Sequence, residues 1–182
     1  MPAAFTSVDD LFAVLDGDGH GVDPYSALDH HVQCADILRR DGADVEMQVA
    51  GLVHDVASSL DPRPSGDHAT IGAELVRRLL GDRVADLVGG HVLAKRYLVT
   101  AEPSYRDVLS GYSTATLALQ GDALSPDESA AFEHHPLADD WMTLRRADDR
   151  AKVVDLVVPG LDDWRPILDD LVARTKLTTA QR

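Results

Sequence analysis

The segment from Val45 to Ala57 limits the possible folds more than any other part of this chain. A helix over these residues would be apolar on most sides, because it carries Val49, Ala50, Leu52, Val53 and Val56. Such a helix is stable in water only when other elements surround it. We therefore expect residues 45–57 to form a central, buried helix.

Helical periodicity continues over nearly the whole chain. Further helices are predicted over residues 8–15, 23 to about 40, 68–80, about 82–98, 110–119, 137–157 and 163 to about 176, with a short one after Ser125. Asp23 and Pro24 form a helix start, and Ser125 with Glu128 forms a capping box. No stretch alternates like a strand for long, and no linker divides the chain. The 182 residues are therefore predicted to form a single all-α domain.

The charge balance excludes several classes of partner. The chain has 17 Lys and Arg residues against 31 Asp and Glu residues, which gives a formal net charge of −14. We expect no nucleic-acid partner and no membrane-surface partner, because both depend on basic residues. No apolar run is long enough to span a membrane, and no signal peptide is predicted. The single cysteine, Cys34, fits a reducing cytoplasm, whereas oligomeric state is left open.

Histidines are the unusual feature of this acidic chain. There are eight of them: His20, His30, His31, His54, His68, His91, His134 and His135. The pair His54-Asp55 lies inside the predicted central helix, where a charged carboxylate is costly unless a partner such as a metal ion compensates it. The alternative for this pair is a hydrogen-bonded histidine followed by an aspartate at a helix end.

Other potential ligands lie on separate predicted helices, namely His30, His68, His91 and Asp148. Imidazole and carboxylate bind divalent iron, manganese and zinc. Four histidines and two aspartates are too many for one catalytic metal with an open position, but they suit two metals that share a bridging carboxylate. Helix phase does not decide between His30 and His31. Asp148 is preferred over Asp149 because Arg145 lies one turn before it on the same helix face.

The order H…HD…H…H…D resembles the HD-domain superfamily, in its variant with two metals. Several segments more closely resemble the PhnZ-like mixed-valent di-iron oxygenases, which cleave the carbon–phosphorus bond of organophosphonates. These segments are YSALDHHVQCADIL, GLVHDV, DHATIGAELV, GGHVLAKRYL, YRDVLSGYSTATLALQGD and FEHHPLADDWMTLRRADDRAK, and they cover roughly residues 20–155. HVLAKRYL and LRRADDRAK are the most specific of these elements. The resemblance implies a single HD-domain helical bundle.

The resemblance also implies a ligand set. It assigns one iron to His30, His54 and Asp148, the other to His68 and His91, and the bridging position to Asp55. His30 is chosen over His31 because the family pattern places the ligand three residues before Gln33. The pair His134-His135 lies in a predicted helix-end loop and is not expected to bind metal.

The same resemblance implies an anion site beside the metals. Lys95, as a catalytic cation, and Arg145 are expected to hold the phosphonate of the substrate, an arrangement that suits a bidentate anion clamp. Ser113 and Thr116 match hydroxyl donors to the same group. Taken singly, Lys95 and Arg145 could equally be surface cations, and Ser113 and Thr116 could equally be helix-packing residues.

Two positions depart from the family pattern, Ser58 and His20, whereas Asp23 keeps the acidic character expected at its position. Ser58 stands where members often carry a histidine that reaches the substrate, so we count it as a substrate contact. His20 and Asp23 stand where a tyrosine and an acidic residue gate the site and recognise the substrate's amine. These departures affect the expected substrate more than the expected metals.

The implied activity is that of an oxidoreductase with two iron ions in a mixed-valent Fe2+/Fe3+ pair and O2 as co-substrate. Its substrate would be a small hydroxylated anion, a 1-hydroxyphosphonate, and its products a carboxylate and phosphate. Two alternatives remain. One is a metal-dependent HD phosphohydrolase of nucleotides or phosphomonoesters, in which the metals activate water. The other is a non-enzymatic metal- or ligand-binding protein.

Overall fold

The computed structural model describes residues 3–17, 25–61, 63 and 65–180. The α-helices are α1 (Val8–Leu15), α2 (Ala27–Arg40), α3 (Val45–Val53), α4 (Val56–Leu60), α5 (His68–Leu80), α6 (Asp82–Ala101), α7 (Gly111–Leu119), α8 (Pro126–Glu133), α9 (Ala138–Arg150) and α10 (Arg165–Ala180). Two 3-10 helices are η1 (Tyr105–Val108) and η2 (Leu161–Trp164). Since the described residues form no strand, the prediction of an all-α fold is confirmed. The single-domain organisation stays a prediction.

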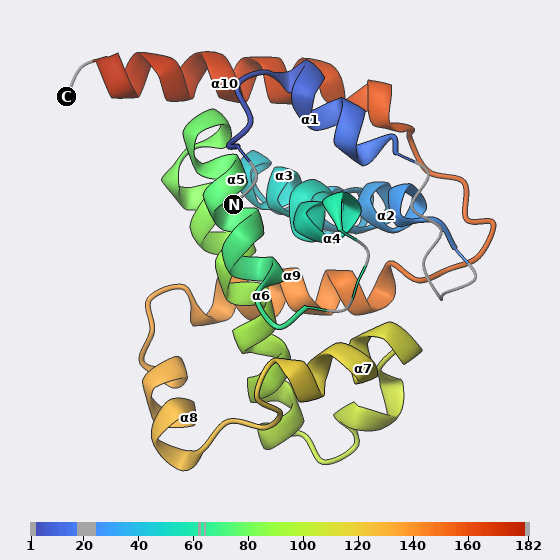
Figure 1. Ribbon diagram of the computed structural model, residues 1–182, viewed down its shortest axis with the longest axis vertical. Helices are drawn as coiled ribbons and strands as arrows, with labels where there is room; N and C mark the ends of the chain where they lie inside the picture. The colour runs from blue at the N-terminus through green and yellow to red at the C-terminus, as the bar shows by residue number, and fades with distance from the viewer. Residues whose placement is uncertain (1–2, 18–24, 62, 64, 181–182) are drawn as a thin grey trace.

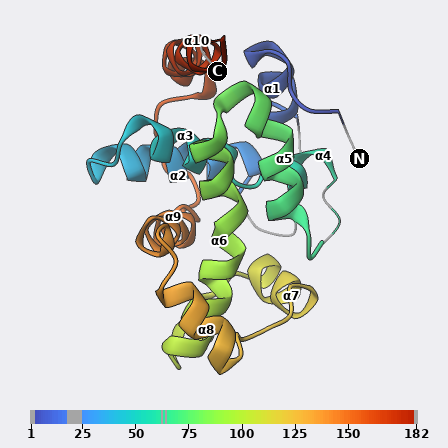
Figure 2. The ribbon, with the colours of Figure 1, turned by 90° about the vertical axis from the view of Figure 1, so that its left-hand side faces the viewer.

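Helix α6 is the axis of the arrangement (Figures 1 and 2). Helices α1 and α10 lie toward one end of it, and α7 and α8 lie at the other end. Helices α5 and α9 pack along α6, and α3 packs against α2, α6 and α9. Among the described helices, none is both long and apolar enough to cross a membrane.

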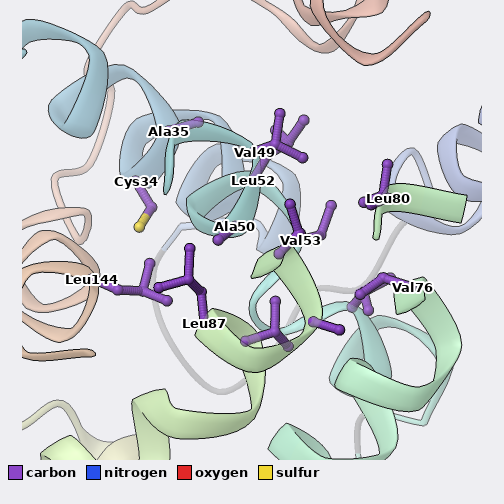
Figure 3. Close-up of a cluster of buried hydrophobic side chains, with 14 of the residues drawn as sticks. Cys34, Ala35, Val49, Ala50, Leu52, Val53, Val76, Leu80, Leu87 and Leu144 are labelled. Atoms are coloured by element: carbon purple, nitrogen blue, oxygen red, sulfur yellow. The ribbon is translucent and has the colours of Figure 1, made fainter. Parts of the chain in front are cut away.

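The core is built around α3, as expected (Figure 3). Val49, Ala50, Leu52 and Val53 are completely buried, and they join one cluster with residues of α2, α5, α6 and α9. Gly51 allows α2 to approach closely, because a Cβ atom at this position would lie 2.5 Å from Cδ1 of Leu38. The central helix therefore brings its C-terminal end, and His54, into the middle of the molecule.

The predicted continuous helix over residues 45–57 is wrong at His54-Asp55. Helix α3 ends at Val53, and α4 begins only at Val56. The backbone of Asp55 leaves the helical conformation, with φ −105° and ψ 17°. The break turns the Asp55 carboxylate toward His68 on α5 and His91 on α6.

The predicted start of the second helix at Asp23 is also wrong. Helix α2 begins at Ala27, with Ser26 as its N-cap. Ser26 Oγ accepts a hydrogen bond from the Asp29 amide at 3.0 Å, and the Asp29 carboxylate accepts one from the Ser26 amide at 3.3 Å. This reciprocal capping box fixes the helix start. Asp23 and His20 lie outside the described residues.

The helix predicted over residues 137–157 ends at Arg150 instead. A side-chain amide from α2 holds the chain that follows: Gln33 Nε2 donates to the Val153 carbonyl at 2.8 Å, and the Val153 amide donates to Gln33 Oε1 at 3.1 Å. These two bonds take the backbone groups of Val153 out of any helix. The segment after α9 is thereby fixed beside His30.

The sequence also favours Asp163 as the N-cap of the last helix, but that helix begins at Arg165, so Asp163 does not cap it. Asp163 lies inside the preceding 3-10 helix, where its carboxylate accepts a hydrogen bond from the Gly160 amide at 2.9 Å. Asp163 thus caps the short 3-10 helix from its third position.

Candidate metal centre

Six of the predicted site residues converge at the centre of the bundle: His30, His54, Asp55, His68, His91 and Asp148. They come from α2, the α3–α4 break, the first residue of α5, the middle of α6 and the last turn of α9. The four imidazoles and Asp148 are buried, and only Asp55 keeps a partly exposed carboxylate. Sequence positions up to 118 residues apart, 148 − 30, therefore contribute to one cluster.

Asp55 lies between two pairs of histidines and turns one oxygen to each pair. Its Oδ2 is 3.6 Å from His54 Nε2 and 4.0 Å from His30 Nε2. Its Oδ1 is 3.3 Å from His68 Nε2 and 3.5 Å from His91 Nε2. Asp55 thus forms one group of three with His30 and His54 and another with His68 and His91. Within each group, the possible ligand atoms all lie within 4.8 Å of one another. This is the arrangement that a carboxylate bridging two metal ions requires.

All four histidines present the same nitrogen to the cluster, because each Nδ1 faces a backbone carbonyl. The pairs are His30 with Ala151 at 2.7 Å, His54 with Gly51 at 2.8 Å, His68 with Ser65 at 3.1 Å and His91 with Val88 at 2.7 Å. A carbonyl only accepts, so Nδ1 carries the proton and the Nε2 lone pair points at Asp55. Metal-ligating histidines are commonly fixed in this way.

The Nε2 atoms also lie close to one another. His30 and His54 are separated by 3.2 Å between these atoms, and His68 and His91 by 3.1 Å. Asp55 Oδ1 is buried and makes no hydrogen bond within the described chain. Lone pairs that face each other at such distances need a proton or a metal ion between them. The donor set therefore fits two metal ions of the kind that bind imidazole and carboxylate.

Asp148 joins this cluster, whereas Asp149 does not. Asp148 Oδ1 is 3.3 Å from His30 Nε2, and Asp148 Oδ2 is 3.9 Å from His54 Nε2. Asp149 instead pairs with Arg145 and accepts a hydrogen bond from Tyr105. The choice of Asp148 thus has a geometric counterpart in the structure, and its role as a ligand stays a prediction.

His30 and His31 point to different surroundings. His31 is buried, and its Nε2 lies 3.0 Å from Ser59 Oγ on α4. His30 is the member of the pair that reaches Asp55 and Asp148. The pair His134-His135 is exposed at the C-terminal end of α8.

The electrostatics of the cluster favour ionised carboxylates. For Asp55, burial acts to raise the pKa, but His54, His68 and His91 outweigh it and hold the pKa well below its usual value. Burial lowers the pKa of His54 to about 4. At neutral pH the sequence His54-Asp55 therefore offers a neutral imidazole beside a carboxylate, which is the protonation state that a metal ion binds.

Lys95 provides a buried cation next to this cluster. It lies one turn after His91 on α6, and only 2% of its surface is exposed. Its Nζ donates to Thr116 Oγ1 at 3.1 Å and is 3.4 Å from the Ser113 carbonyl. Burial, followed by the nearby charge of Arg145, lowers the pKa of Lys95 to about 7. Since both partners are neutral, an anion would stabilise the charged form of this lysine.

Arg145 is buried in a network of its own. Its Nη1 donates to Asp148 Oδ2 at 2.5 Å, and its Nε donates to the Tyr105 hydroxyl at 2.8 Å. Its Nη2 pairs with Asp149. The guanidinium thus links the carboxylate nearest His30 to η1, and it is held in one orientation.

These groups surround a narrow cavity of about 20 Å³. It is lined by His30, Asp55, His68, His91, Lys95, Tyr112, Ser113, Thr116, Arg145, Asp148 and Lys152. Ser58 contacts this lining through Tyr112, whose hydroxyl lies 3.4 Å from Ser58 Oγ.

Sequence reasoning missed two lining residues, Tyr112 and Lys152. Lys152 could have been found, because it lies four residues after Asp148 in the motif LRRADDRAK. Tyr112 gave no comparable signal, since it precedes Ser113 in an otherwise ordinary helix start.

A family model described as an HD domain matches residues 27–156. The chain belongs to the HD-domain family. The match begins at the first residue of α2 and includes all six residues of the HD-domain cluster.

Three curated relatives are similar over most of the chain. The [1-hydroxy-2-(trimethylamino)ethyl]phosphonate dioxygenase (glycine-betaine-forming) of Leisingera caerulea is 30% identical over 158 residues, which cover 82% of this chain and 81% of that protein. The hydroxymethylphosphonate dioxygenase of Gimesia maris is 31% identical over 168 residues, with 86% and 84% covered. Uncharacterized protein L432 of Acanthamoeba polyphaga mimivirus is 27% identical over 175 residues, with 91% and 80% covered.

Proposed function

We propose that this HD-domain protein is a di-iron oxygenase that uses O2 to cleave the carbon–phosphorus bond of a small 1-hydroxyphosphonate. One observation carries the proposal: the Asp55 carboxylate lies between two pairs of histidines, so that each pair together with Asp55 forms a set of two histidines and one carboxylate. That set with open positions is typical of non-haem iron oxygenases. The similarity to two phosphonate dioxygenases supports the same assignment.

In this proposal His30, His54 and Asp148 would hold one iron, His68 and His91 would hold the other, and Asp55 would be shared between them. A mixed-valent iron pair would supply the activation of O2 and the redox capacity of the reaction. The chain contributes geometry: the carbonyls that accept from each Nδ1 keep the four imidazoles oriented toward Asp55.

The cations beside the metals would bind the phosphonate. Lys95 and Arg145 both line the cavity, and both are buried, so an anion between them would be largely shielded from water. Thr116 and the Ser113 carbonyl hold the Lys95 ammonium toward the cavity. Arg145 has five N–H groups, and three of them donate to Tyr105, Asp148 and Asp149, so two remain for a phosphonate oxygen. Ser113 and Thr116 line the same cavity and would offer hydroxyl groups to the phosphonate.

The reaction balances with O2 as the only oxidant. For hydroxymethylphosphonate, the dianion and O2 give formate, hydrogen phosphate and one proton. The carbon loses its bonds to phosphorus and to one hydrogen and gains a second bond to its hydroxyl oxygen and one new bond to oxygen. The carbon atom is oxidised by four electrons, and O2 is reduced by four.

A single Cys34, buried in α2, is consistent with an enzyme of the reducing cytoplasm.

The test is anaerobic purification, metal analysis and electron paramagnetic resonance, followed by O2-uptake assays with a panel of 1-hydroxyphosphonates. We expect two irons per chain, a signal from a mixed-valent pair and release of phosphate that equals the O2 consumed. A redox-inert metal together with phosphomonoester turnover in the absence of O2 would instead identify an HD phosphohydrolase. Protein that retains no metal under these conditions would identify a non-enzymatic member of the family.

A further inference from the structure

Lys152 is a third cation at the cavity, and the proposed function assigns it no role. It follows the last turn of α9, and its side chain is 13% exposed. Its Nζ is 3.2 Å from Asp148 Oδ1 and 3.2 Å from Asp149 Oδ1. The side chain therefore pairs with two carboxylates while it also lines the space in which the substrate would bind.

The partner of Lys152 is the oxygen that faces the cluster. Asp148 Oδ1 is the atom that lies 3.3 Å from His30 Nε2, whereas Arg145 Nη1 binds the other oxygen, Oδ2. A cation held by His30 and Asp148 would use Oδ1 and would lie beside the ammonium of Lys152. Two like charges at one carboxylate oxygen repel each other.

The balance of charges around Asp148 also indicates that a bound metal ion would displace Lys152 from this carboxylate. In the described structure, Asp148 and Asp149 carry two negative charges, which Arg145 and Lys152 balance. A divalent or trivalent ion at Asp148 makes the Lys152 charge surplus. The cavity that Lys152 lines is the nearest place for an anion that would neutralise it.

We propose that Lys152 couples metal loading to substrate binding. It neutralises Asp148 in the metal-free protein, and once a metal ion takes over that role its ammonium turns to the anionic group of the substrate. The chain can permit this movement, because Lys152 lies beyond the end of α9. The proposal rests on the proposed function for its substrate class, since it needs an anion next to a metal-bound Asp148.

Two consequences can be measured without turnover. Lys152 competes with the metal in the absence of substrate, so Lys152→Met should bind Mn²⁺ more tightly than the wild type. Lys152 also favours the anion once metal is bound, so the same variant should bind methylphosphonate more weakly. Methylphosphonate suits this purpose because it lacks the hydroxyl group at which the reaction begins.

The experiment measures Mn²⁺ affinity, and then methylphosphonate affinity with and without Mn²⁺, in three proteins. In the wild type, we expect Mn²⁺ to strengthen methylphosphonate binding about tenfold, which lies within the usual range of coupling between two sites. In Lys152→Met we expect Mn²⁺ affinity to rise about threefold and the coupling to fall severalfold. Arg150→Met is the matched control, because Arg150 pairs with Asp41 on the exposed side of α9 and should leave both values unchanged.

The outcomes separate this proposal from the proposed function. If the wild type binds Mn²⁺ but no methylphosphonate, the substrate class is wrong and the coupling fails with it. If the wild type binds both and Lys152→Met behaves like Arg150→Met, only the coupling is wrong. Weaker Mn²⁺ binding in Lys152→Met would also overturn it, because Lys152 would then support the metal site. Lys152→Gln serves as the second variant should Lys152→Met lack a normal helical circular dichroism spectrum.

Discussion

The indole ring of Trp141 lies directly on Gly90, one residue before His91. A Cβ atom at Gly90 would be 2.0 Å from both Cε2 and Nε1 of the ring. The ring is also fixed by its Nε1, which donates to the Asp86 carbonyl at 2.8 Å. This contact sets how closely α9, with Asp148, approaches α6, with His91.

Gly90→Ala should therefore destabilise the protein. The added methyl group forces Trp141 or α9 to move, and overpacking of this kind costs about 1–3 kcal/mol. Alanine's better helix propensity returns at most about 1 kcal/mol. We expect a net loss of about 1–2 kcal/mol in the free energy of unfolding, measured by urea denaturation. We also expect weaker Mn²⁺ binding, since α9 shifts relative to α6.

The adjacent Gly89→Ala variant is the matched control. A Cβ atom at Gly89 would meet only the Ala73 Cβ, at an ordinary 3.5 Å. This variant should be neutral or more stable by up to about 1 kcal/mol. Equal effects of the two substitutions would show that the Trp141 contact does not limit the spacing of the helices.

Local signals in the sequence predicted much of this fold. The limits of α1 and the start of α8 follow from caps and helical periodicity, and both agree with the structure. The apolar residues of α3 correctly predicted its central position. What the local sequence could not predict are the places where distant residues fix the backbone. The break at Asp55 depends on histidines from α5 and α6, and the end of α9 depends on Gln33 from α2.

The candidate site was likewise only partly predictable from the local sequence. A family pattern was needed to choose His30 over His31, because both lie on a buried part of α2 and only the three-dimensional structure shows which one faces Asp55. Lys152 was missed although it lies four residues after Asp148, on the same face of the helix predicted over residues 137–157. The structure ends α9 at Arg150 and brings Lys152 back over the cavity.

The clamp between Gln33 and Val153 offers a second stability test. Gln33→Leu removes both hydrogen bonds and leaves the amide and carbonyl of Val153 without their partner. Loss of two such bonds should cost about 1–3 kcal/mol in the free energy of unfolding. Metal affinity should also fall, because the same segment supplies the Ala151 carbonyl that orients His30.

Gln48→Leu provides the comparison for this variant. Gln48 is partly buried and its Nε2 donates to the Ala43 carbonyl at 2.7 Å, at the start of α3. Its replacement should cost at most about 1 kcal/mol and should leave Mn²⁺ affinity unchanged. The clamp would be unimportant for the site if Gln33→Leu kept the wild-type affinity as well.

Asp55 is the residue shared by both proposed metal positions. Asp55→Ala should lose both metals, because it removes the oxygens that face His54 and His30 on one side and His68 and His91 on the other. Metal content per chain and the metal-induced rise in melting temperature measure the effect. Two metals retained in Asp55→Ala would contradict the bridging role.

Lys95→Ala should keep both metals and bind methylphosphonate at least about tenfold more weakly, since a buried charge–anion contact is lost.

The pKa of Lys95 gives the last prediction, on the pH dependence of stability. This pKa is lowered to about 7 in the folded chain by burial and then by Arg145, from an ordinary value of 10.5. Between these two values the unfolded chain holds a proton that the folded chain has released, so folding stability due to this group rises with pH over that window. Below about pH 7 the charged lysine is buried at full cost, and there Lys95→Met should be most stabilising relative to the wild type.

Urea denaturation of metal-free wild type and Lys95→Met at several pH values between 6 and about 10.5 measures this difference. The advantage of the variant should shrink steadily as pH rises, because all other titrating groups are common to both proteins. Anion binding should show the reverse trend: below about pH 7 Lys95 is charged, so the ratio of wild-type to variant affinity for methylphosphonate should be largest there. The ratio cancels the ionisation of the ligand itself. A ratio that stays constant across this range would show that Lys95 does not meet the anion.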